Sequence, residues 1–98
     1  MKTNFIQSKS KNTKLELSII PCIEKQELNF CESFKGTPKQ LINRSLEIIY
    51  GLNKVLKNDD FSIKIQSFDL TKTIYLNSEN LFDEDFNIIG KVEDFMNV

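Results

Sequence analysis

The last twenty residues carry most of the side chains that could take part in chemistry. Residues 79–98 contain six acids against one lysine, and Asp83, Glu84 and Asp85 are consecutive. A calcium loop needs carboxylates at alternate positions, a glycine at the sixth position and a glutamate at the twelfth, and this stretch lacks that spacing. Together with Glu93 and Asp94, these acids form either a solvated face or, as we expect, a surface that attracts a basic partner.

The composition gives little support for an enzymatic activity. The chain has no histidine, which is the commonest general base and metal ligand at neutral pH. Its three glycines are scattered at positions 36, 51 and 90, so no phosphate-binding loop is present. No serine or cysteine has a histidine to activate it. We therefore expect neither an enzyme nor a bound metal or other cofactor.

Nucleic-acid binding is the alternative function. Phe68 and Tyr75, with Lys64 and Lys72 nearby, could present aromatic rings and positive charge on one sheet face for stacked bases. Residues 1–13 carry lysines and no acid, so they could act as a basic arm. Against this alternative, the chain has a single arginine and a pI near 5.4.

The clearest structural signal is a helix over residues 37–57. Thr37 and Gln40 match the capping-box pattern, and Pro38 falls at the first helical position. Apolar residues then recur at steps of three and four, which is the period of an amphipathic helix. Gly51 interrupts the pattern, and we expect it to pack closely against a strand; the alternative is that a partner's backbone approaches it.

Two alternating stretches before this helix predict a hairpin. Residues 14–24 and 28–34 place apolar side chains at every second position, with a polar turn between them. Apolar pairing on one face then predicts that Ile23 lies opposite Phe30 and Ile19 opposite Phe34.

The same register predicts that the two cysteines lie opposite each other. Cys22 and Cys31 would then be within reach of a disulfide. In the cytoplasm, where we expect this chain because no secretory signal is evident, two free thiols are the expected state.

After the helix, residues 61–67 and 73–77 alternate again and predict a second hairpin, with a turn at 68–72. Residues 78–98 are ambiguous. Phe82, Phe86 and Ile89 have helical spacing, so we expect a helix that ends or kinks at Gly90. The alternative is a hairpin with its turn at 83–87 and its second strand at 87–95.

These elements predict an α+β fold in the order ββαββα, a two-layer sandwich with an antiparallel sheet of two hairpins, one long central helix and a C-terminal helix. Residues 1–13 are expected to be a flexible basic arm and 14–98 a single domain. The expected core consists of Leu17, Ile19, Ile23, Phe30, Ile42, Leu46, Ile49, Leu52, Leu56, Ile63, Ile65, Ile74 and Leu76.

The expected function is that of a small protein-binding module, of the kind that phages and mobile elements use as inhibitors or immunity proteins. No run of 18 apolar residues is present, so we expect no membrane partner. A homodimer is a further expectation, because outward-facing apolar residues or edge strands could join two copies.

Overall fold

The structure is a computed structural model that describes residues 12–57 and 60–96. Most of the expected basic arm, residues 1–11, therefore lies outside the described part of the chain. The described elements in chain order are β1 (Leu15–Ile23), β2 (Gln26–Glu27), β3 (Glu32–Gly36), α1 (Pro38–Leu56), β4 (Phe61–Ser67), β5 (Thr73–Leu76), β6 (Asn80–Phe82), β7 (Ile88–Lys91) and α2 (Glu93–Met96).

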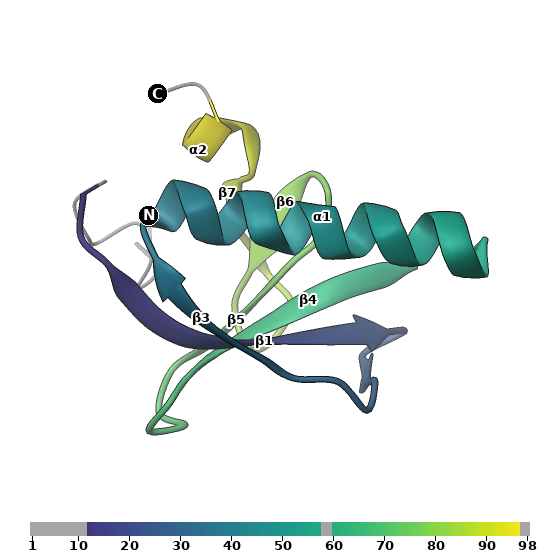
Figure 1. The fold of residues 1–98 in the computed structure, drawn as a ribbon, viewed down its shortest axis with the longest axis horizontal. Helices are drawn as coiled ribbons and strands as arrows, with labels where there is room; N and C mark the ends of the chain where they lie inside the picture. The colour runs from purple at the N-terminus through teal and green to yellow at the C-terminus, as the bar shows by residue number, and fades with distance from the viewer. Residues whose placement is uncertain (1–11, 58–59, 97–98) are drawn as a thin grey trace.

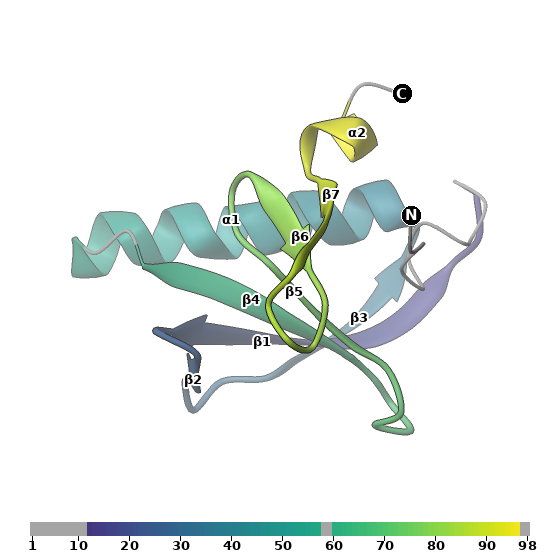
Figure 2. The same ribbon diagram turned by 180° about the vertical axis from the view of Figure 1, so that it is seen from behind.

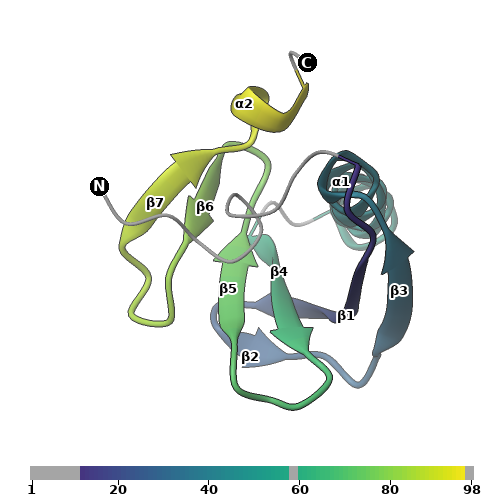
Figure 3. The same ribbon diagram turned by 90° about the vertical axis from the view of Figure 1, so that its left-hand side faces the viewer.

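One antiparallel sheet of seven strands carries the long helix on one face. The strand order is β2-β1-β4-β5-β6-β7, and β3 also pairs with β1. Figure 1 and Figure 2 show α1 lying across the sheet, and Figure 3 shows that the sheet curves until β6 and β7 rise beside the helix. The α+β class, the antiparallel sheet, the long helix and the C-terminal helix were all predicted correctly.

The start of α1 follows the capping signals of its sequence. The Thr37 hydroxyl accepts a hydrogen bond from the backbone N–H of Gln40 at 3.3 Å, and the Gln40 side chain accepts one from the Thr37 N–H at 2.9 Å. Pro38 is the first helical residue, where the missing N–H removes no helix bond. At the other end, Lys57 adopts a left-handed conformation and closes the last turn.

The expected close packing at Gly51 is wrong. Apart from the adjoining backbone of the helix, no atom lies within 4 Å of the position that a Cβ would occupy there, and the residue is exposed. The apolar stripe of α1 faces the sheet through Leu41, Ile42 and Ile49, and Gly51 lies off that stripe.

The first hairpin forms, but its predicted register is wrong. Near the turn, Cys22 lies opposite Glu27, and farther from the turn Leu17 lies opposite Phe34. Five residues of β1 therefore correspond to seven residues of the second arm, which contains two extra residues between β2 and β3. The interruption lies at Pro21, whose carbonyl accepts a bond from Leu28 at 2.9 Å. Proline has no N–H to complete the pair on that side. The chain therefore leaves the ladder between β2 and β3.

Two of the predicted core residues are exposed in the structure. Phe30 is 48% exposed because it lies in the segment that leaves the ladder, and Leu56 is 56% exposed because the helix extends past the sheet there. Ile23 and Leu52 are partly buried against the core. The remaining predicted core residues are buried, and further buried apolar residues that were not predicted are Leu15, Ile20, Cys22, Leu41, Phe61, Leu81 and Val92.

Residues 80–91 form the hairpin that was the alternative prediction, not the favoured helix. β6 pairs with β7, and a turn at residues 83–87 joins them. Leu81 points into the core with 0% exposure. The C-terminal helix is present but short, because α2 begins only at Glu93.

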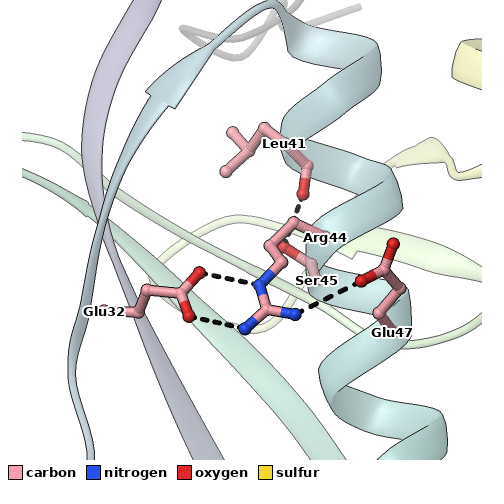
Figure 4. Close-up of polar contacts among 5 residues, drawn as sticks. All are labelled: Glu32, Leu41, Arg44, Ser45 and Glu47. Atoms are coloured by element: carbon pink, nitrogen blue, oxygen red, sulfur yellow. Dashed lines mark hydrogen bonds and ion pairs between the residues drawn. The ribbon is translucent and has the colours of Figure 1, made fainter.

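Arg44, the single arginine of the chain, links α1 to Glu32 at the start of β3. Arg44 donates two hydrogen bonds to the carboxylate of Glu32, from Nε at 2.8 Å and from Nη2 at 2.7 Å, and a third to Glu47 at 3.2 Å (Figure 4). Such bidentate geometry is stronger and more directional than an ordinary surface ion pair. Arg44 lowers the pKa of Glu32 mainly through these hydrogen bonds.

We expect acid to remove this stabilisation. Because the pKa of Glu32 is lowered by folding, its contribution is present above the pKa of the unfolded chain, about 4.3, and is lost as the pH falls through the folded value. Both side chains are partly exposed, so the effect should be about 0.5–1 kcal/mol. Urea unfolding at pH 7 and pH 3 should show a smaller loss of stability for Glu32→Gln than for the wild type. Equal losses would contradict this role, and Glu16→Gln serves as a control in a more exposed pair.

Candidate functional site

The acidic residues of the C-terminal region lie along the hairpin formed by β6 and β7. Asp83 organises the turn: its Oδ1 accepts hydrogen bonds from the backbone N–H of Asp85 and of Asn87, both at 2.9 Å. Glu84 and Asp85 therefore project from a fixed turn and are exposed. This geometry leaves their carboxylates available for a partner.

The other two acids lie at the opposite end of the hairpin. Glu93 and Asp94 are in α2, which follows β7 and lies away from the turn in Figure 1 and Figure 3. The five acids are therefore not one compact cluster. Glu93 borders a separate hollow beside Lys91 and residues 78–80, whereas Asp94 lies along the outer edge of β7.

A shallow hollow runs along β7 from the turn at residues 83–87 to α2. Asp83 and Asp94 line it, with Ile88, Ile89 and Lys91 between them. Ile88 is 63% exposed, and β7 is the last strand of the sheet order among the described residues. A sheet edge offers backbone hydrogen bonds to an extended segment. We name this surface, residues 83–94 of the hairpin and α2, the β7 edge.

The residues predicted for the nucleic-acid alternative do not form one face. Lys64 is on β4, where its ammonium group bonds to Glu27 at 3.1 Å and is mostly covered, and this hydrogen bond raises its pKa. Tyr75 lies opposite it on β5, but its ring stacks on Phe86 with centroids 4.4 Å apart. One face of the Tyr75 ring and the charge of Lys64 are therefore already engaged within the chain.

Phe68 and Lys72 lie elsewhere, at the tip of the hairpin formed by β4 and β5. This tip projects from the sheet in Figure 1 and Figure 2. Asp69 accepts hydrogen bonds from the hydroxyls of Ser67 and Thr71, both at 2.7 Å, and these bonds hold its pKa at about 2. Phe68 is 52% exposed on this ordered turn. It lies four residues beyond Lys64, the partner of Tyr75 on the ladder, so at about 3.3 Å per residue the two rings are not adjacent.

The two cysteines are free thiols, as predicted, but for a different reason from the one expected. Cys22 is buried and Cys31 is exposed, and the corrected register separates them. Burial raises the pKa of the Cys22 thiol, which makes it less reactive.

A third hollow brings Tyr75 together with residues that were not predicted to form a site. It lies where the second half of α1 meets the ends of β4 and β5 and the turn after β1. Its lining includes Glu24, Asn53, Asp60, Glu79, Tyr75 and Phe86. We call it the α1–β5 hollow. Those residues come from six separate segments, so no local spacing in the sequence could reveal this hollow.

The described residues include no group of three or more cysteine, aspartate or glutamate side chains placed to hold a metal ion. Among them, no helix has both the length and the apolar character needed to cross a membrane. In comparisons with known proteins, no protein-family model, curated protein or solved structure significantly matches this chain.

Proposed function

We propose that this chain is a small, non-enzymatic protein-binding module that docks on a basic partner surface through the β7 edge. The observation that carries the proposal is the hollow along β7, which has the exposed Ile88 and the half-buried Ile89 in its middle and a carboxylate toward each end. Apolar contact area supplies affinity in such an interface, while the charged rim governs orientation and the rate of association.

The form of the molecule fits an inhibitor or an immunity-type protein, which acts by occupying a surface of its target. Such a protein needs a rigid scaffold and no reacting groups. Here the sheet and α1 hold the hairpin, and the Asp83 hydrogen bonds fix its turn. A partner segment in extended conformation could add to the edge of β7, with basic side chains directed at Asp85 and Asp94.

The test starts with capture of partners from a lysate of the native host, with and without nuclease, and identification of the retained protein. The purified partner is then titrated against Asp85→Lys/Asp94→Lys and against a control, Glu16→Lys/Glu47→Lys. Both variants change the net charge equally, but the control acids lie on β1 and α1. We expect the first variant to bind roughly tenfold more weakly, with most of the change in the association rate and its salt dependence, and the control to bind nearly as the wild type.

Equal weakening by both variants would show that only net charge matters and would contradict docking at the β7 edge. Retention that disappears with nuclease would instead favour nucleic acid, and Phe68→Ala/Tyr75→Ala would then test base stacking. Elution of the pure chain at the size of two copies, independent of any partner, would favour the homodimer.

A further inference from the structure

We propose that residues 1–11 of this same chain cover the β7 edge when no partner is bound, so that the protein carries its own competitor for that surface. The inference rests on the proposed function of the β7 edge and adds a form of regulation to it. We call residues 1–11, which lie outside the described part of the chain, the N-terminal segment. The open sheet edge, the charge and spacing of the segment, and the place where β1 begins all support this occupant.

The first observation is the open edge of the sheet at β7. Among the described residues, β7 pairs only with β6, and the strand order ends there. Ile88 is 63% exposed on this strand, and the hollow beside it also contains the half-buried Ile89. Natural proteins protect such edges, and cover by a loop of the same chain is one of the means. The edge therefore suits an extended segment with apolar side chains.

The N-terminal segment carries charge of the opposite sign to the β7 edge. The segment has three lysines and no acid, which gives +3. Residues 83–94 have five acids and one lysine, which gives −4. Opposite charges on two surfaces attract each other and orient the surfaces before contact. The same complementarity that we propose for a basic partner is thus present within the chain.

The apolar residues of the segment also match those of the edge in spacing. Residues 5 and 6 are phenylalanine and isoleucine, and residues 88 and 89 are both isoleucine. In a strand parallel to β7 with these two pairs side by side, Lys2 comes near Asp85, because each charge precedes its apolar pair by three residues. Successive side chains of a strand point to opposite faces, so each apolar residue of the segment meets an isoleucine on its own face.

The position at which β1 begins favours this parallel direction. Leu15 pairs with Gly36, directly before α1, so the described chain begins near the start of α1. α2 contacts α1 and lies beside its first half in Figure 1 and Figure 2. A segment that runs along β7 toward α2 therefore ends on the side of the molecule where β1 begins, with Lys11 directed toward Asp94. Eleven extended residues span about 36 Å, and the longest axis of the molecule is 35 Å.

Cover by the N-terminal segment lowers the apparent affinity for a partner. A short tether gives the segment an effective concentration on the order of millimolar at the edge, so weak contacts are enough to cover it most of the time. A partner binds only the uncovered form, and its apparent affinity falls in proportion to the uncovered fraction. The segment therefore sets a threshold that only a partner with better contacts overcomes.

The test measures paramagnetic relaxation in the full, ¹⁵N-labelled chain. A nitroxide is attached through Ser8→Cys in a Cys31→Ser background, because Cys22 is buried and should not react. We expect the label to broaden the amide signals of residues 88–91 and to leave Leu56, at the far end of α1, sharp. Added salt should reduce the broadening. Broadening confined to the start of β1, or spread evenly over the whole surface, would overturn the proposal.

Lys2→Glu/Lys11→Glu in the labelled chain is the specific variant, and it should abolish most of the broadening at β7. Lys39→Glu/Lys54→Glu is the matched control, since it changes the net charge equally at exposed positions of α1. The control should keep the broadening. If the segment variant keeps it as well, or if both variants lose it, specific docking of the segment on the β7 edge is wrong.

A mixed sample identifies the copy that supplies the segment. Spin-labelled chain without ¹⁵N is mixed with unlabelled ¹⁵N chain, and we expect no broadening at residues 88–91. Broadening in this mixture would show that the segment of a second copy occupies the edge, which would overturn cover by the chain's own residues.

The regulatory consequence is tested with the captured partner. Lys2→Glu/Lys11→Glu should bind it more tightly than Lys39→Glu/Lys54→Glu does, by about tenfold if the segment covers the edge about nine-tenths of the time. Equal affinity of the two variants would overturn the competition. The relaxation measurements involve no partner, so failure of the cover and failure of the proposed protein-binding function are distinguishable.

Discussion

Replacing Leu81 by alanine should destabilise the protein by about 3 kcal/mol, a large part of the 5–15 kcal/mol typical of a small domain. Leu81 is fully buried on β6, opposite Leu76, and belongs to the same core as the residues of α1. Truncation removes the transfer free energy of its side chain and leaves a cavity that the sheet can fill only partly. Urea unfolding followed by circular dichroism measures the change.

Leu56→Ala is the matched control, because it removes the same atoms from an exposed position. Leu56 is 56% exposed at the end of α1 and should lose less than about 1 kcal/mol. Leu56 was among the expected core residues, and Leu81 was not. A larger loss for Leu56→Ala than for Leu81→Ala would contradict the burial that the hairpin of β6 and β7 gives to Leu81.

The misleading signal in that region was a coincidence of spacing. Phe82, Phe86 and Ile89 recur at steps of four and three, but in the folded chain Phe82 is on β6, Phe86 is in the turn and Ile89 is on β7. Strands of three and four residues are too short to display a period of two. The better signal was Asp83, since an aspartate that bonds backbone N–H groups two and four residues later marks a turn.

The parts that were predicted correctly are those in which several local signals agree. Thr37, Pro38 and Gln40 fix the start of α1, and its apolar period fixes the buried face. The hairpin of β4 and β5 likewise follows from clean alternation on both sides of the break at residues 68–72. By contrast, the register of the first hairpin depends on what happens at Pro21, where a missing donor can be absorbed by a bulge or by the end of a strand.

The candidate surfaces were harder to predict, because they depend on which segments meet. The acidic residues were identified individually, but their division between a turn and α2 follows from the direction of β7. Tyr75 was expected to be open for stacking, and no local pattern indicates that Phe86, eleven residues later, covers it. The α1–β5 hollow combines the turn after β1, the end of α1 and the turn before β6, which only the tertiary fold brings together.

Alanine substitution should change the stability in opposite directions at Gly36, just before α1, and at Gly51, inside α1. Gly36→Ala should destabilise the protein by about 1–3 kcal/mol. A Cβ at Gly36 would lie 2.7 Å from Oε1 of Gln40 and 2.7 Å from Cζ of Phe34. Moving Gln40 breaks its bond to the Thr37 N–H in the capping box, and moving Phe34 disturbs a ring that packs against the core.

Gly51→Ala should instead stabilise the protein by about 1 kcal/mol, because alanine favours a helix interior and restricts the unfolded chain. Its Cβ meets no atom within 4 Å, so no steric cost opposes this gain. Urea midpoints of the two variants measured against the wild type test both signs. If Gly51→Ala is stable but Gly51→Leu weakens binding of the captured partner, the glycine keeps α1 open to a partner's backbone. If neither substitution affects binding, this part of α1 lies outside the interface.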